Sequence, residues 1–291
     1  MPKTLIEELE AAQLAMTHQT PEQLRALFLK QFNALAQHRR RYEVFRDFVT
    51  LSAISLNNVM EPDPERKATL EAEYMGIIRA YSHDEALGFA ELLGLVVELL
   101  EPMPQDVLGD LYMELDLGNE RTGQFFTPNS ISQFMARLNG VEPPAGQNFV
   151  RVCEPACGAG GMVLAIAQAL IEGGKNPATA MWAQCQDIDR TAAFMCFVQL
   201  SLWNIPAAVI VGDTLANEVR ECFYTPAHHL GAWEWRLDRG KAIQEQAQSP
   251  HSKPMHMEPA AQVPRPAAPY AGGGKRKKLI GCSEMLNDGK F

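Results

Sequence analysis

The sequence lacks the features that place a chain in a membrane or outside the cell. Its 291 residues contain no run of 18 uncharged apolar residues, and the charged first ten residues do not resemble a signal peptide. Six cysteines show no Cys-x-x-Cys spacing, which disfavours a zinc site and structural disulfides. A metal group at Cys222, His228 and His229 is less favoured than a polar loop. We expect a cytoplasmic protein that binds neither membrane nor metal.

Basic residues are scarce over most of the chain. Lys and Arg number 26, against 35 Asp and Glu. Residues 241–291 hold 8 basic and 4 acidic residues, so the first 240 residues hold 18 basic and 31 acidic. Because phosphate neutralisation dominates affinity for duplex DNA, the acidic body should bind DNA weakly by itself unless its charges are segregated.

The first part of the chain, residues 1–104, is predicted to be a helical domain. Thr20-Pro21-Glu22-Gln23 supplies an N-cap, a proline at the first helical position and a capping-box glutamine. Further helices are expected at about 41–60, 64–80 and 84–101. Taken by itself, such a bundle could simply support the fold that follows.

Two further parts follow the helical domain. Residues 105–240 alternate short apolar strands with helices, which predicts an α/β domain. Residues 241–291 are rich in Pro, Ala, Gln and Gly, which favours a disordered tail, and they include the basic cluster Lys275–Lys278. The tail could serve solubility alone or add a few phosphate contacts.

The most specific pattern in the α/β part is a strand that leads into a glycine-rich turn. Phe149, Val150 and Val152 are apolar and lead to Glu154, and the glycines at 158, 160 and 161 then let the backbone turn sharply before an Ala-rich helix. The free N–H groups of that helix start favour negative charge. The alternative is an ordinary tight turn. A dinucleotide fingerprint would need glycine where Val163 stands, so an NAD site is disfavoured.

Acidic residues follow three successive predicted strands. Glu154 ends the first strand, Asp187 follows the apolar run 181–185, and Asp213 follows the run 207–211. Each acid alone could be a helix cap or a solvated loop residue. Ligands of open α/β sheets gather at the carboxyl ends of the strands, so three acids there predict a ligand site with hydroxyl or amine groups.

These segments together resemble the adenine-N6 DNA methyltransferases, most closely the modification subunits of type I restriction systems. Gly123-Gln124-Phe125-Phe126-Thr127-Pro128, Glu154-Pro155-Ala156-Cys157-Gly158-Ala159-Gly160-Gly161, Gln186-Asp187 and Gly212-Asp213-Thr214-Leu215 match the family's motifs in order and spacing. The resemblance covers roughly residues 105–215. It implies a Rossmann-like sheet, here truncated, that binds S-adenosylmethionine (SAM). The cofactor contacts it implies are Phe125, Phe126, Thr127, Pro128, Glu154, Pro155, Ala156, Gly158, Gly160, Asp187, Ile188, Asp213 and Thr214.

One part of the family pattern is missing. Family members carry Asn-Pro-Pro-Tyr or Asn-Pro-Pro-Phe after a fourth strand, where it holds the target amine and stacks on a flipped base. The nearest segment here is Phe223-Tyr224-Thr225-Pro226-Ala227, which has no Asn or Asp beside the ring. Phe223 and Tyr224 are therefore weak candidates for the catalytic ring. Positioning of the amine can be worth about 7 to 11 kcal/mol of barrier, so its loss should remove most of the rate.

Two hypotheses follow from the resemblance and the departure. The first is a SAM-dependent DNA adenine-N6 methyltransferase or its modification subunit, with DNA and a specificity or restriction subunit as partners. The second is a catalytically inactive SAM-binding or assembly subunit, or half of a split methyltransferase. An RNA or protein-glutamine target stays open, because no target-recognition domain is legible in the sequence.

Overall fold

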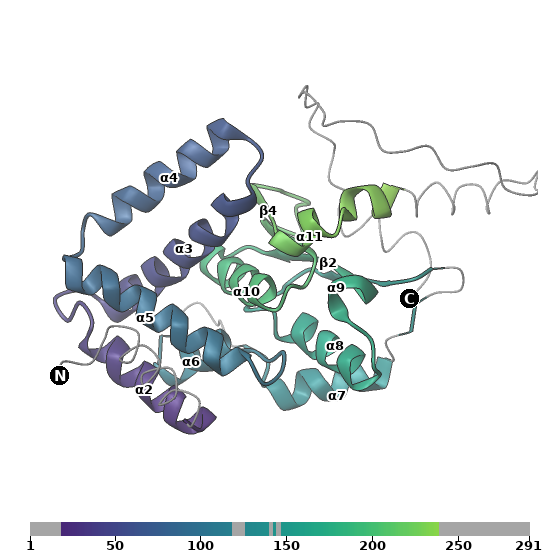
Figure 1. Ribbon diagram of the computed structural model, residues 1–291, viewed down its shortest axis with the longest axis horizontal. Coiled ribbons are helices and arrows are strands. Elements are labelled where there is room, and N and C mark those ends of the chain that lie inside the picture. Colours follow the sequence, from purple (N-terminus) through teal and green to yellow (C-terminus); the bar gives the residue numbers. More distant parts are fainter. Residues whose placement is uncertain (1–18, 118–125, 140–141, 144–146, 239–291) are drawn as a thin grey trace, which may run out of the picture. The chain divides into compact units, whose positions relative to one another are not determined.

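The computed structural model describes residues 19–117, 126–139, 142–143 and 147–238 (Figure 1). Through Trp233 the described residues belong to one compact unit, and the residues from Glu234 onward belong to a second. Of the second unit the structure describes residues 234–238, a short helical segment. The tail expected at 241–291 lies outside the described residues. No helix among the described residues is long and apolar enough to cross a bilayer.

The helical part begins as the sequence predicts. The Thr20 hydroxyl accepts a hydrogen bond from the Gln23 amide at 3.3 Å, and the Gln23 side chain accepts one from the Thr20 amide at 2.9 Å, which completes the capping box. The three helices expected after it are present with ends shifted by at most two residues. The helices of this part are α2 (Pro21–Ala34), α3 (Arg41–Met60), α4 (Pro64–Ile78), α5 (His83–Leu100) and α6 (Val107–Glu114).

Aromatic rings form the core of the helical part. Phe28 and Phe32 of α2 meet Phe48 and Phe45 of α3 with ring centroids 6.0 and 5.9 Å apart. Phe48 also stacks on Phe89 of α5 at 6.4 Å. Buried aromatic pairs contribute about 0.5 to 1.5 kcal/mol each beyond the burial of their area. These helices therefore pack through aromatic contacts, within a core that continues into the α/β part.

A four-stranded sheet follows the helices in the chain. Its strand order is β1-β2-β3-β4, with β1, β2 and β3 parallel and β4 antiparallel to β3. The mixed α/β architecture with a helical amino-terminal part is confirmed. The elements of this part are α7 (Asn129–Asn139), β1 (Val150–Glu154), α8 (Gly161–Glu172), α9 (Pro177–Ala180), β2 (Met181–Asp187), α10 (Arg190–Leu202), β3 (Ala207–Val211), β4 (Glu221–Tyr224) and α11 (Pro226–Leu230).

Helix α10 joins the two halves of the compact unit. It packs on β2 and β3 with one side and on α3 with another, and it lies between the helical part and the sheet in Figure 1. Phe194 and Phe197 on this helix are fully buried. A helix that is apolar on several faces has no solvent side, which explains its almost continuous buried sequence.

Four of the described cysteines, Cys157, Cys185, Cys196 and Cys222, carry free thiols. The described residues contain no group of three or more His, Cys, Asp or Glu placed to hold a metal ion.

Arg190 should stabilise the junction of α4, α10 and β4. Its guanidinium lies 2.6 Å from a Glu73 oxygen and 2.8 Å from a Glu221 oxygen. We expect Arg190→Ala to lower the free energy of unfolding by about 1 to 3 kcal/mol, because two half-buried carboxylates lose their shared partner. Urea unfolding measures the change. Arg137→Ala, which breaks a more exposed pair with Glu172, should cost about 0 to 1 kcal/mol. Equal costs would contradict this interpretation.

Candidate cofactor site at the carboxyl ends of the strands

The turn after β1 depends on two glycines in left-handed conformations. Gly158 has φ +52° and Gly160 has φ +97°, which L side chains rarely adopt. A Cβ at Gly158 would lie 3.0 Å from the Phe126 ring, and one at Gly160 would lie 3.0 Å from the Cys196 sulfur. Backbone conformation and close packing therefore both require glycine here. The turn leads directly into α8.

Asp187 ties the ends of β1 and β2 together. One of its carboxylate oxygens accepts a hydrogen bond from the Gly158 amide at 2.8 Å, and the other accepts one from the Asp189 amide at 2.9 Å. Burial raises the pKa of Asp187, and these amide donors oppose that rise. A carboxylate has about four lone-pair sites, so two remain for a ligand.

Glu154 adds a second carboxyl at the same edge of the sheet. It accepts a hydrogen bond from the Ala156 amide at 3.3 Å. Burial raises the pKa of Glu154, and the negative charge of Asp187 raises it further. A positively charged group between these carboxyls would oppose both effects. The edge is thus electrostatically suited to a cationic ligand.

The end of β3 is bonded to the other two strand ends. The Thr214 hydroxyl donates to the Pro155 carbonyl at 2.6 Å, and the Gly212 amide donates to the Asp187 carbonyl at 2.9 Å. The Asp213 carboxylate accepts from the Leu215 and Ala216 amides at 2.9 and 3.1 Å. The structure therefore brings the acids at 154, 187 and 213 to one edge of the sheet, as the sequence predicts.

The remaining predicted contacts are placed unevenly around this edge. The Phe126 ring packs on Gly158 and meets Tyr112 edge-on at 5.3 Å. Ile188 beside Asp187 is 61% exposed. Thr127, Pro128, Pro155 and Ala156 are exposed as well. Phe125 lies outside the described residues.

The two weak catalytic candidates do not join this edge. Strand β4 runs antiparallel, and its register pairs Tyr224 with Ala208, near the amino end of β3. The acids lie at the carboxyl ends of the parallel strands. Phe223 is buried against Phe194, with ring centroids 4.9 Å apart, and its side chain is 1% exposed. Stacking of Phe223 or Tyr224 on a base beside the acids does not fit this geometry.

A buried polar network beneath the turn was missed at the level of sequence. Asp106 caps α6 by accepting from the Gly109 amide at 2.8 Å, and the same oxygen accepts from the Gln199 side chain at 2.9 Å. Asn129, the first residue of α7, accepts a hydrogen bond from the Asp106 amide at 2.9 Å. The aspartate three residues before Gly109 is an N-cap signal, but nothing in the sequence pairs it with Gln199.

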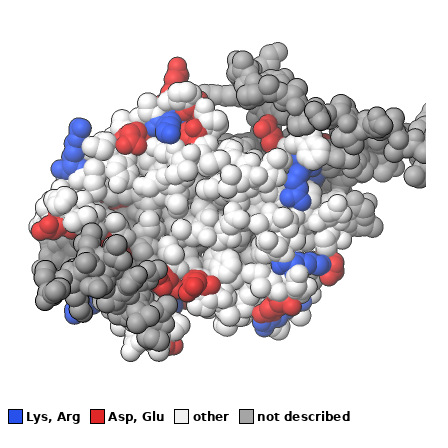
Figure 2. Space-filling view, viewed as in Figure 1, with Lys and Arg blue, Asp and Glu red and all other residues white. Residues whose placement is uncertain are grey.

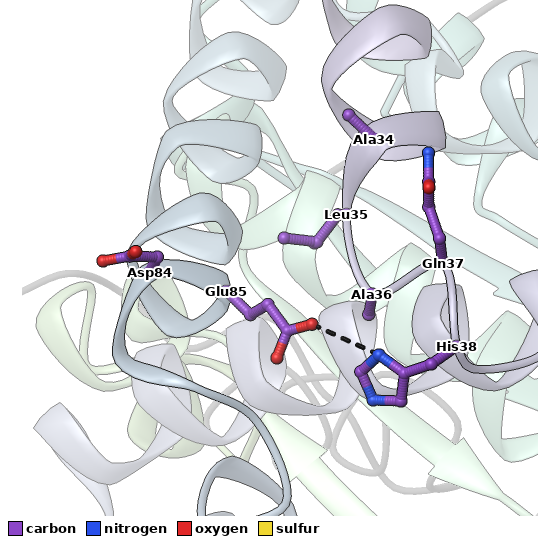
Figure 3. Close-up of a pocket in the computed structure, with 7 residues that line it drawn as sticks. All are labelled: Ala34, Leu35, Ala36, Gln37, His38, Asp84 and Glu85. Carbon is purple, nitrogen blue, oxygen red and sulfur yellow. Dashed lines mark ion pairs between the residues drawn. The ribbon is translucent and has the colours of Figure 1, made fainter.

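One hollow in the described surface lies away from this edge of the sheet. It measures about 470 Å³ and is formed by the end of α2 and the start of α5 (Figure 3). His38 and Glu85 face each other there at 3.6 Å. The hollow contains none of the three strand-end acids. We assign no catalytic or binding role to the residues that line it.

The comparisons with known proteins agree with the motifs. Residues 104–230 match the N-6 DNA methylase family. This confirms the family resemblance. The methylase-like region, as we call residues 104–230, includes the turn, all three acids and β4. The type I restriction enzyme MpnII methylase subunit of Mycoplasma pneumoniae is 28% identical over 137 residues, which are 44% of this chain and 24% of the relative. The chain thus spans about a quarter of that relative's length.

Two solved structures are similar with a lower sequence identity. A class I S-adenosylmethionine-dependent methyltransferase from Listeria monocytogenes is 13% identical, with a TM-score of 0.37 over 70% of this chain and 66% of that one. A type I restriction-modification methyltransferase subunit from Streptococcus thermophilus is 13% identical, with a TM-score of 0.33 over 65% and 57%. The α/β assignment of the methylase-like region rests on its own strand order.

Phe223 should stabilise the fold without contributing to a cofactor site. We expect Phe223→Ala to lower the free energy of unfolding by about 3 to 5 kcal/mol, because it leaves a cavity against Phe194. Calorimetric affinity for SAM, measured where the variant is folded, should stay within twofold of the unmodified chain. Tyr224→Ala should likewise leave this affinity unchanged. A tenfold loss of SAM affinity in either variant would show that the ring contributes to the cofactor site.

Asp106 should make stability depend on pH. Burial raises the pKa of Asp106 from 3.8 to about 6, although hydrogen bonds from Gln199 and Gly109 oppose the rise. The native state therefore binds this proton more tightly than the unfolded state. Its contribution to stability is present below pH 4 and is lost as the pH rises to about 6. The loss is about 3 kcal/mol.

Asp106→Asn removes the titrating group and keeps an oxygen for the Gly109 amide. The free energy of unfolding of the unmodified chain, minus that of the variant, should fall by about 3 kcal/mol between pH 4 and pH 7. Urea unfolding at several pH values gives this difference. A difference that is constant with pH would show that Asp106 is not the titrating group.

Proposed function

We propose that the methylase-like region binds SAM at the carboxyl ends of β1, β2 and β3. The observation that carries this proposal is the convergence of Glu154, Asp187 and Asp213 on one edge, beside a glycine turn held by Asp187. SAM carries an ammonium and a sulfonium charge, which suit two carboxyls whose pKa values are raised by burial and by neighbouring negative charge: that of Asp187 for Glu154, and that of Asp189 for Asp187. When bound, SAM would supply an activated methyl group.

The residues have separate roles in this proposal. Asp187 would accept hydrogen bonds from the ribose hydroxyls with its remaining lone pairs, and Glu154 would face the positive charge of the cofactor. Asp213 would accept from the exocyclic amine of the cofactor's adenine. Ile188 offers exposed apolar surface for the adenine ring. Phe126 would wall the methionine end, since its ring lies on Gly158.

We further propose that the chain acts in adenine-N6 methylation of DNA, as a relative of type I modification subunits. The family match and the Mycoplasma relative support this assignment. Lys and Arg form small separate groups on the face shown in Figure 2. Phosphate binding needs gathered positive charge, and this face does not offer it. Because residues 1–240 hold 31 acidic and 18 basic residues, we propose that a partner such as a specificity or restriction subunit assists DNA binding.

The second candidate is a SAM-binding assembly subunit or half of a split enzyme. The register that places Tyr224 beside Ala208 favours it, because Tyr224 then lies near the amino end of β3, whereas the acids follow the carboxyl ends of the parallel strands. In this case a second polypeptide would hold the target amine. Transfer of a methyl group by the isolated chain distinguishes the two candidates.

Asp187→Ala tests the cofactor site directly. We expect the unmodified chain to bind SAM in a calorimeter and the variant to bind at least about tenfold more weakly, because loss of one charged hydrogen-bond partner costs about 1.5 to 3 kcal/mol. Asp84→Ala, which changes an acid outside the site, is the control. Unchanged affinity in Asp187→Ala would contradict the proposed site.

Methyl transfer is measured on the same samples with tritiated SAM and adenine-containing duplex DNA. Transfer by the isolated chain supports the first candidate. Binding without transfer supports the second. If the unmodified chain binds no SAM, both candidates fail.

A further inference from the structure

The side chain of Gln199 lies at the meeting point of three segments. It projects from α10 and is fully buried. Its amide nitrogen donates to the Ala159 carbonyl at 2.8 Å and to Asp106 at 2.9 Å. Its amide oxygen accepts from the Val107 and Leu108 amides at 2.8 and 3.0 Å. Both donors and both acceptor sites of the glutamine are therefore used.

Ala159 is the central residue of the glycine turn. It stands between Gly158 and Gly160, which both have left-handed backbone conformations. Glycine adopts positive and negative φ about equally readily, so contacts with neighbouring residues must hold the turn in this shape. Gln199 holds the carbonyl of Ala159 from below. Cys196, one helical turn earlier on α10, packs against Gly160. One face of α10 thus supports both sides of the turn.

The conformation of the glycine turn also determines the orientation of the Asp187 side chain, through the Gly158 amide. The Gly158 amide reaches the Asp187 carboxylate at 2.8 Å only while the turn keeps its shape. Gln199 has no donor left for a ligand, because Asp106 and the Ala159 carbonyl accept both of its N–H groups. It would therefore act on a bound cofactor through the turn and Asp187.

We propose that Gln199 is a positioning residue for the cofactor site, fixing the turn at 158–160 against α10 and the start of α6. The proposal rests on the proposed SAM site and extends it to a residue outside the motifs. A glutamine is suited to this position because it offers donors and acceptors together without charge. An apolar side chain of the same size would leave the Ala159 carbonyl and the Leu108 amide unpaired, whereas the Val107 amide would keep its bond to the Gln105 carbonyl.

Gln199→Met tests the proposal, because methionine keeps the length of the side chain and removes its hydrogen bonds. Gln168→Met is the matched control: Gln168 is also a buried glutamine, on α8, and its side-chain nitrogen donates to Glu172. Two quantities are measured on each variant: SAM affinity by calorimetry, and hydrogen exchange of the Gly158 amide by NMR without ligand.

We expect Gln199→Met to weaken SAM binding about tenfold or more and to speed Gly158 exchange by a similar factor, because an unpaired buried carbonyl costs about one such factor or more. Gln168→Met should change both by less than twofold. If Gln199→Met leaves the exchange of Gly158 unchanged, or if both variants change it equally, the positioning role is overturned.

Gln199→Asn covers the case in which the methionine variant does not fold. It stays polar and uncharged, and its side chain is one methylene shorter, so it cannot reach the Ala159 carbonyl and the amides of Val107 and Leu108 together. It should fold and still show faster Gly158 exchange; unchanged exchange contradicts the proposal. If the unmodified chain binds no SAM, the proposed function fails and the cofactor part of this proposal fails with it. The exchange rates then decide whether Gln199 holds the turn.

Discussion

The hydrogen bond from the Gly158 amide to Asp187 is the contact on which the candidate site depends. It joins the loop after β1 to the end of β2, and the Gly212 amide joins β3 to the same aspartate through its main-chain carbonyl. Three parallel strands thereby keep their carboxyl ends in register. Because a carboxylate accepts several hydrogen bonds at once, Asp187 can organise protein backbone and still offer oxygens to a ligand.

Much of this site could be predicted from the sequence, because its signals are local. Glycines at 158 and 160 and acids directly after apolar runs are read from neighbouring residues, and the parallel order of β1 to β3 follows from the helices between them. The capping box at Thr20 is a local signal of the same kind. The glycine turn, the acids after the strands and the capping box each involve residues that are only a few positions apart in the sequence.

The features that could not be predicted are contacts between distant residues. Gln199 and Asp106 are 93 residues apart, and nothing in either local pattern indicates that they share a hydrogen bond. Arg190 meets Glu73 across 117 residues. The direction of β4 was also beyond local reading, because four residues fit a parallel or an antiparallel strand equally well. Such pairings are decided by packing of whole elements.

The direction of β4 has a consequence for the missing half of the chemistry. An antiparallel strand ends where its parallel neighbour begins, so the residues after Tyr224 start at the edge opposite to the acids. A residue that holds an acceptor amine must lie at the edge where the methyl donor would be bound. The end of β4 therefore does not supply the residue that holds the acceptor amine. Under the proposed function, the group that holds the acceptor amine must come from a segment other than the end of β4.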